Sequence, residues 1–318
     1  MKHHYKSKKS RKKDFKRIQA NNKILKIIES SQTYKMKKKV EKLSSMCLFN
    51  KPEKKIREEL DKIKGLPFMT TIFHKGKEIE RAVPNTKNEP IFESVSRISY
   101  KPLKYNTNYQ RASTPKNTMF YGCVIPENPS ENEIQYARIV SSAETCELLR
   151  NENAADGNEL ITFGKWIVKE DLNLATIVNP YEKYKIQSLA GLVAEYQNCL
   201  NTLPNDCYLA SIYFLKFITK EFSKKVDKGK NYEYIISAIF TEILVSNPNN
   251  DIDGIIYPSV QVGKEGLCVA ICPKSMKKLE LFKVLQCEVI RKGKKVCLNN
   301  IRFTSNIRSD GTFDLEDI

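Results

Sequence analysis

The stretch QRASTPKNTMFYGCVIPEN, residues 110–128, leads through a loop into ARIVSSAETCELLR, residues 137–150. Within it, the aromatic-rich run Met119–Val124 predicts a strand, and apolar residues at helical spacing predict a helix over Arg138–Asn151. A second stretch, DGIIYPSV at residues 253–260, is a turn that leads into an apolar run. The rest of the chain has the sequence pattern of ordinary packed protein.

Four side chains of these stretches fall at element ends or on a helix face: Arg111, Tyr121, Glu144 and Ser259. Glu144 lies just off the apolar stripe of its predicted helix. We interpret the four side chains as the walls of one anion-binding cleft that contains a single carboxylate.

Length and composition are those of a folded protein with a substantial core, since the 318 residues are 41% hydrophobic and 29% charged. No run of about 18 apolar residues occurs, so we expect no membrane-spanning helix and no membrane partner. The nine cysteines are too irregularly spaced for a disulfide framework. We therefore expect a reducing, cytoplasmic location.

The net charge of +17 is concentrated at one end of the chain. Residues 1–64 contain 22 Lys and Arg against 7 Asp and Glu, whereas the remaining residues contain 32 against 30. A basic arm on a nearly neutral body is a weaker indication of a nucleic-acid-binding protein than a basic surface throughout.

Four segments are predicted. Residues 1–20 form a disordered basic tail that could contact nucleic acid, although a solvated tail explains the same charges. Residues 21–65 form a helical extension, residues 66–304 the main domain, and residues 305–318 a polar, acidic tail.

Strands and helices without regular alternation predict an α+β fold. Residues 66–104 are rich in loops, and the alternating segment Phe92–Tyr100 predicts a strand with Arg97 near its end. Further strands are predicted at 165–168, 172–178 and 266–272, three helices at 184–200, 208–223 and 232–246, and a closing hairpin over 280–303.

Several common catalytic motifs are absent from the sequence. It has no GxGxxG, no P-loop, no GxSxG and no HExxH, and two of its three histidines lie in the basic tail. Four cysteines lack the paired spacing of a zinc site and are expected to be buried in strands: Cys268, Cys272, Cys287 and Cys297. We expect no metal.

With these motifs excluded, arginine, tyrosine, glutamate and serine are the remaining candidates, and their chemistry matches one substrate. Arginine binds a diphosphate through its planar fork, and tyrosine stacks on an aromatic leaving group. A single carboxylate stabilises the cationic character that develops at a glycosidic carbon as its bond breaks. NAD, cleaved between ribose and nicotinamide, presents all three features.

The body of the chain, over residues 94–273, resembles the RES-domain family of bacterial proteins. The segment Ser-Arg97-Ile-Ser looks like the family's first arginine, and Gln-Arg111-Ala-Ser-Thr-Pro followed by Met-Phe-Tyr121-Gly resembles its arginine turn and aromatic strand. The segment Ser-Ala-Glu144-Thr resembles the helix glutamate. Asp-Gly-Ile-Ile-Tyr257-Pro-Ser259-Val resembles the closing serine motif.

The resemblance implies an ADP-ribosyltransferase-like fold, with a mixed sheet and flanking helices. It also implies an NAD-consuming toxin or defence effector that a partner antitoxin or another regulatory protein would restrain. Carried over to this sequence, Glu144, Arg97 and Ser259 would be catalytic. Arg97, Arg111, Tyr121 and Tyr257 would bind NAD. NAD would be the substrate rather than a cofactor, with inorganic phosphate as a possible co-substrate of an NAD phosphorylase; with water as acceptor, the enzyme would be an NAD glycohydrolase.

Other interpretations stay open. Transfer of ADP-ribose to a macromolecule is the nearest alternative activity, and a non-catalytic nucleic-acid binder that uses its basic arm is the alternative outside enzymes. For the individual residues, Arg97 and Arg111 could be ion-paired, Tyr121 a core aromatic, Glu144 a solvated helix residue, and Ser259 a turn hydroxyl.

Overall fold

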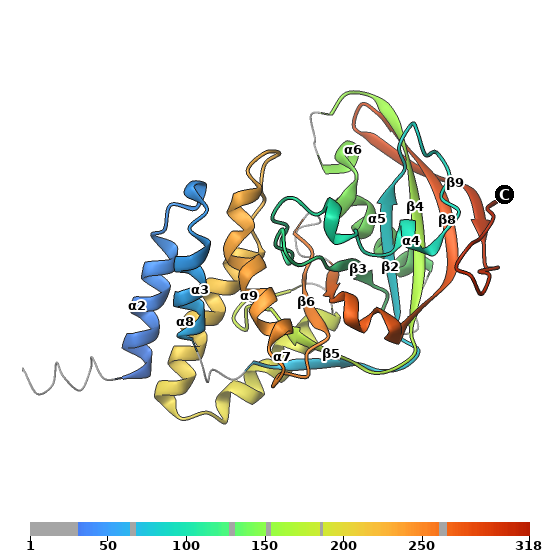
Figure 1. Ribbon diagram of the computed structural model, residues 1–318. Helices are drawn as coiled ribbons and strands as arrows, with labels where there is room; N and C mark the ends of the chain where they lie inside the picture. Colours follow the sequence, from blue (N-terminus) through green and yellow to red (C-terminus); the bar gives the residue numbers. More distant parts are fainter. Residues whose placement is uncertain (1–30, 64–67, 127–130, 151–153, 185–186, 261–265) are drawn as a thin grey trace, which may run out of the picture.

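The computed structural model describes residues 31–63, 68–126, 131–150, 154–184, 187–260 and 266–318, and the predicted basic tail lies outside these ranges. The predicted α+β class is confirmed, because the chain forms a ten-stranded mixed sheet with flanking helices (Figure 1). The strand order is β1-β5-β6-β7-β3-β2-β4-β8-β9-β10. Only β5 and β6 pair in parallel among the described strands.

The strands are β1 Thr70–Phe73, β2 Glu78–Pro84, β3 Phe120–Val124, β4 Gly157–Val168, β5 Leu172–Thr176, β6 Gly254–Pro258, β7 Leu267–Ile271, β8 Leu279–Lys292, β9 Lys295–Thr304 and β10 Glu316–Asp317. The helices are α2 Gln32–Ser44, α3 Glu53–Asp61, α4 Val95–Ile98, α5 Glu131–Thr145, α6 Glu147–Arg150, α7 Gln187–Asn201, α8 Asn205–Phe222 and α9 Ile235–Ser246. Four short 3-10 helices are η1 Leu48–Asn50, η2 Leu103–Tyr105, η3 Asn231–Tyr234 and η4 Pro273–Lys278.

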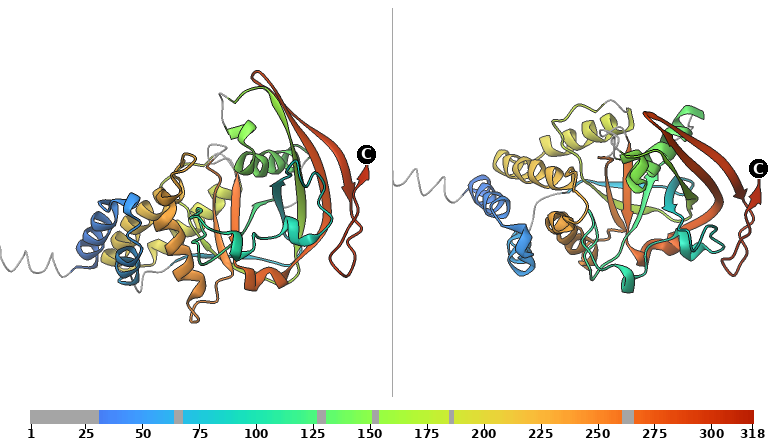
Figure 2. Two further views of the ribbon diagram at one scale, coloured as in Figure 1. Left: turned by 45° about the horizontal axis from the view of Figure 1, so that its top comes forward. Right: turned by 90° about the horizontal axis from the view of Figure 1, so that it is seen from above.

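The long strands β4, β8 and β9 curve around helices α5 and α6, which lie inside that curve (Figures 1 and 2). The predicted closing hairpin corresponds to β8 and β9, and its turn contains Gly293 at a φ of 58°. A left-handed backbone of this kind favours glycine because a side chain would clash there. Helices α2, α3, α8 and α9 gather at the opposite end of the molecule (Figure 2).

The helices of the N-terminal extension pack into the core of the protein. Met36 and Leu43 of α2 and Ile56 and Leu60 of α3 are buried in the same apolar cluster as residues of α8 and α9. The docking is reinforced at the start of α2, where the Thr33 hydroxyl and backbone N–H donate to the Asp206 carboxylate. Helices α2 and α3 therefore carry charge on their outer faces and bury apolar side chains on their inner faces.

The central strands alternate between two apolar clusters, one on each face of the sheet. On β3, Phe120 belongs to one cluster, whereas Tyr121 and Cys123 face the other. This alternation is what a strand buried on both faces requires. It also means that neighbouring residues of β3 meet different helices.

Several sequence-based predictions of elements need correction. Residues 92–100 contain the short helix α4 and not a strand, although Phe92 and Ile98 are buried as an alternating pattern would have them. Strands β1 and β2 were missed in the segment predicted to be loops. Residues 305–318 are not a simple polar tail, because Phe313 is fully buried and β10 pairs with β9.

Among the described residues, no helix combines the length and the apolar character needed to cross a membrane.

Candidate functional site

Glu144 and Ser259, which are 115 positions apart in the sequence, are in direct contact. The Ser259 hydroxyl donates to Oε1 of Glu144 over 2.6 Å. Ser259 is fully buried, and its backbone N–H donates to the carbonyl of Gly266 over 2.7 Å. The structure therefore brings together the acid and the hydroxyl that the sequence motifs predicted.

A glycine sets how closely α5 approaches the strands that carry Ser259. A Cβ atom added to Gly266 would lie 2.8 Å from the side chain of Val140 on α5, which is closer than real contacts allow. Gly266 therefore permits the helix to pack against the start of β7. The same approach brings Glu144, one turn further along α5, to Ser259.

Arg111 lies in the predicted turn, closed by backbone hydrogen bonds between Gln110 and Ser113. It is 6% exposed, and its Nη1 donates to the carbonyl of Phe222, the last residue of helix α8, and to that of Lys224, two residues further on. A cation at this position is favourable because the last carbonyls of a helix carry partial negative charge. Part of the guanidinium is therefore already used to cap α8.

The Arg111 guanidinium also lies between two tyrosine rings. Its Cζ is 5.1 Å from the ring centroid of Tyr234 and 6.0 Å from that of Tyr257, distances typical of cation–π contacts. Burial, reinforced by nearby Cys268 and Glu144, raises the pKa of Tyr257 well above its usual value. The ring of Tyr257 is consequently a neutral wall beside the cation.

Tyr121 connects the arginine turn to strand β3. Its hydroxyl accepts from the Ala112 backbone N–H over 3.1 Å and lies 2.8 Å from the Ser113 hydroxyl. Burial raises the pKa of Tyr121 to about 12, so the phenol is neutral at pH 7. Arg111, Tyr121, Tyr257, Glu144 and Ser259 thus belong to one face of the sheet, which we call the acid–arginine face.

Arg97 is not brought to the acid–arginine face. It lies on α4, 45% of its side chain is exposed, and both ends of its guanidinium bond the Glu89 carboxylate. Its Cζ lies 4.9 Å from the ring centroid of Phe92, which packs in the cluster containing Phe120. Because Phe120 and Tyr121 point to opposite faces of β3, Arg97 lies across the sheet from the acid.

Two cysteines at the acid were not identified as part of a site. Cys268 on β7 has its sulfur 4.0 Å from Oε1 of Glu144 and 3.8 Å from the sulfur of Cys123 on β3. Cys268 is the register partner of Tyr257, so the alternation along β6 and β7 could have placed both on one face. The hydrogen bond with Cys268, together with burial, raises the pKa of Cys123 well above the ordinary value of a thiol, so this thiol is protonated at pH 7.

The expectation that the four strand cysteines are buried is confirmed for Cys268, Cys272 and Cys287, and it is wrong for Cys297, which is exposed on β9. Within the described ranges, no group of three or more His, Cys, Asp or Glu side chains is arranged to hold a metal ion.

A partly buried arginine in the missed strand β2 was also overlooked. Nη1 of Arg81 donates to the Tyr121 carbonyl over 2.7 Å, and its Cζ lies 5.2 Å from the Phe120 ring centroid. Its Nε has no hydrogen-bond partner among the described residues. Burial lowers the pKa of Arg81 to about 10, so the side chain is still a cation at pH 7.

Two cavities among the described residues are lined by side chains other than those of the acid–arginine face. One, of about 900 Å³, lies between α3, α9 and the loop at 247–252. The other, of about 310 Å³, is lined by residues of α5, β4, β8 and β9. The segment 261–265, which follows Val260 in the sequence, is outside the described residues.

No family model matches the chain, and no curated protein matches it significantly.

Proposed function

We propose that this protein cleaves the bond between nicotinamide and ribose in NAD, with Glu144 as the essential carboxylate. The observation that carries the proposal is the 2.6 Å contact between Glu144 and Ser259. It joins the two motifs that, in the sequence, resemble the glutamate and serine motifs of the RES-domain family. The mixed sheet and its flanking helices are compatible with an ADP-ribosyltransferase-like fold.

The proposed chemistry assigns each group of the acid–arginine face a role. As the glycosidic bond breaks, its electron pair leaves with nicotinamide, and the positive charge on the ribose carbon is stabilised by the Glu144 carboxylate. Ser259 holds that carboxylate in one orientation through its hydrogen bond. Attack by water then yields ADP-ribose and a proton, and attack by phosphate yields a phosphorylated ADP-ribose.

The walls of the proposed site supply positive charge and neutral aromatic surface. Arg111 places its guanidinium beside the Tyr257 ring. Tyr121 and Tyr257 remain uncharged at pH 7, because burial raises the pKa of each phenol. Arg97 has no part in this proposal, because it is engaged by Glu89 on the other face of the sheet.

The test is to incubate the full chain with NAD, with and without inorganic phosphate, and to identify the products by mass spectrometry. We expect nicotinamide from the wild type and a loss of about 100-fold or more in Glu144→Gln, as for removal of a group that acts on the transition state. Glu195→Gln, an exposed glutamate of α7, is the matched control and should keep full activity.

Equal NAD consumption by wild type and Glu144→Gln would refute the proposed role of Glu144. Label from radioactive NAD that remains on protein or nucleic acid would instead identify a transferase. We also propose that the activity makes expression toxic, so that growth arrest should be relieved by Glu144→Gln and not by Glu195→Gln.

A further inference from the structure

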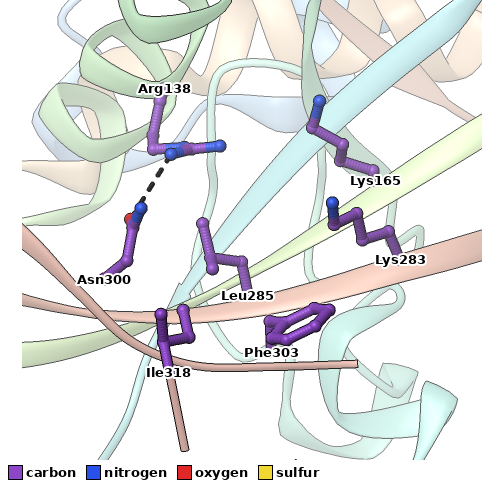
Figure 3. A pocket seen from close by; sticks show the side chains of 7 residues that line it. All are labelled: Arg138, Lys165, Lys283, Leu285, Asn300, Phe303 and Ile318. Carbon is purple, nitrogen blue, oxygen red and sulfur yellow. Dashed lines mark hydrogen bonds between the residues drawn. The ribbon is translucent and has the colours of Figure 1, made fainter. Parts of the chain in front are cut away.

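Two lysines face each other on adjacent strands, close to helix α5. Lys165 of β4 and Lys283 of β8 are direct register partners at an irregularity between the two strands. Like charges placed opposite one another in this way destabilise a sheet. A third cation, Arg138 of α5, reaches the same side of the sheet, so that three cationic side chains surround one space (Figure 3).

Among the described residues, fewer acidic side chains than cations lie at this space. Glu80 of β2 is the register partner of Lys165, and its Oε2 lies 3.8 Å from Nε of Arg138. Glu80 is fully buried, and burial raises its pKa despite the nearby Arg138 and Lys165. Glu316 of β10 is the register partner of Phe303 at the rim, but it does not line the cavity.

Arg138 is held in place although its positive charge is only partly matched. Its Cζ lies 5.7 Å from the Phe163 ring centroid, and Nη1 is 3.5 Å from the Asn300 side-chain oxygen. Its Nε is buried and has no hydrogen-bond partner among the described residues. Only 18% of the side chain is exposed, so this guanidinium is a positioned donor rather than a mobile surface cation.

Apolar side chains form the other half of the space. Leu285 and Phe303 are register partners on β8 and β9, and together with Ile318 they line the cavity below the cations in Figure 3. Its volume of about 310 Å³ is at the lower end of the range of small-molecule sites. The ligand that fits must be small, anionic at one end and apolar at the other.

We propose that this cavity, lined by Arg138, Lys165, Lys283, Leu285 and Phe303, binds a small phosphate monoester whose organic part is flat and apolar. The phosphate dianion accepts hydrogen bonds from the three cations and relieves the repulsion between the lysines. The organic part covers Leu285 and the Phe303 ring. This site is separate from Glu144, which leaves α5 toward Ser259, so the proposal does not depend on NAD cleavage.

The experiment is isothermal titration calorimetry of the full chain with phenyl phosphate, in the absence of NAD. We expect saturable binding by the wild type, and affinity at least about tenfold weaker in the double variant Lys165→Met, Lys283→Met. The matched control is Lys292→Met, an exposed lysine at the far end of β8, which should bind within about twofold of wild type.

Two further ligands separate the halves of the site. Inorganic phosphate and benzyl alcohol should each bind more weakly than phenyl phosphate, since each fills only one half. Phosphate binding as tightly as phenyl phosphate would overturn the apolar half of the proposal. Absence of phenyl phosphate binding, or unchanged binding by the double variant, would overturn the whole.

Folding of the variants is checked by thermal unfolding without ligand. Removing two opposed lysines should leave the unfolding midpoint of the double variant equal to or above that of wild type. If the double variant unfolds early, the two single lysine variants are titrated in its place, and both must bind more weakly than Lys292→Met for the proposal to stand.

Discussion

Arg97 and Arg111 are close in the sequence and were both predicted to bind a diphosphate, yet the fold gives them opposite surroundings. Arg111 is buried, caps helix α8 and lies between two tyrosine rings. Arg97 is half-exposed on α4 and pairs with Glu89. The difference comes from the sheet, because the two arginines lie on opposite faces of it.

The hydrogen bonds and ion pairs that each guanidinium already makes determine how much it contributes to stability. A surface pair such as Arg97–Glu89 contributes about 0–1 kcal/mol to stability and is screened by salt. A buried guanidinium that donates hydrogen bonds to backbone carbonyls contributes more to stability, because its loss leaves those carbonyls unpaired. Substitution of Arg111 should therefore lower the free energy of unfolding more than substitution of Arg97, and this can be measured without an activity assay.

The largest stability effect is expected for Arg111→Ala. We expect the free energy of unfolding to fall by about 3 kcal/mol, because the carbonyls of Phe222 and Lys224 lose a charged donor. Urea unfolding followed by circular dichroism measures the change. Arg111→Lys should recover part of it, and a change below about 1 kcal/mol would show that the capping interaction is weak.

Asp253 directly precedes β6, the strand that leads to Ser259, and its buried carboxylate should make the stability of the protein depend on pH. Burial by itself would raise the pKa of Asp253, but its hydrogen-bonded donors outweigh that effect and lower the pKa below its usual value near 3.8. These donors are Lys278 Nζ, the Ser275 hydroxyl and the Asn173 backbone N–H.

Since the folded-state pKa of Asp253 is lowered, its stabilising contribution is present above pH 3.8 and is lost as the pH falls through the folded-state value. Asp253→Asn should therefore lower the free energy of unfolding by about 2 kcal/mol at pH 7 and by less at pH 3. Urea titrations at the two pH values measure both differences. A larger effect of the substitution at pH 3 would contradict the assignment.

Tyr121→Phe is expected to have a smaller effect. The substitution removes a hydroxyl that bonds the Ala112 N–H and the Ser113 hydroxyl. We expect a loss of about 1 kcal/mol, measured by urea unfolding. Tyr105→Phe, at an exposed tyrosine, serves as the control and should be neutral.

The smallest effect is expected for Arg97→Ala, because the pair with Glu89 is partly exposed. The free energy of unfolding should fall by less than about 1 kcal/mol, and the difference from wild type should shrink further in high salt. A loss as large as that of Arg111→Ala would remove the contrast between the two arginines.

The parts of the fold that could be predicted from the sequence are those with a clear local pattern. Strand β3 and the helix that carries Glu144 were predicted because aromatic and apolar residues recur there at strand or helix spacing. Strand β2 was missed because its buried positions include Glu80 and its last residue is Pro84, both unusual in strands.

Arg97 shows why the site was predicted only in part. Phe92 and Ile98 are both buried, as in a strand, but between them the chain forms α4. Which face of the sheet the segment covers is set by partners distant in sequence, such as Trp166 of β4. Similarly, the contact of Glu144 with Cys268 depends on pairing between β3 and β7, which local periodicity does not specify.

The most direct test of the account compares nicotinamide release from NAD by two variants, Glu144→Gln and Arg97→Ala. We predict that Glu144→Gln releases nicotinamide about 100-fold more slowly than wild type, and that Arg97→Ala stays within about twofold of wild type. Full activity in Glu144→Gln, or loss of release in Arg97→Ala, would contradict it.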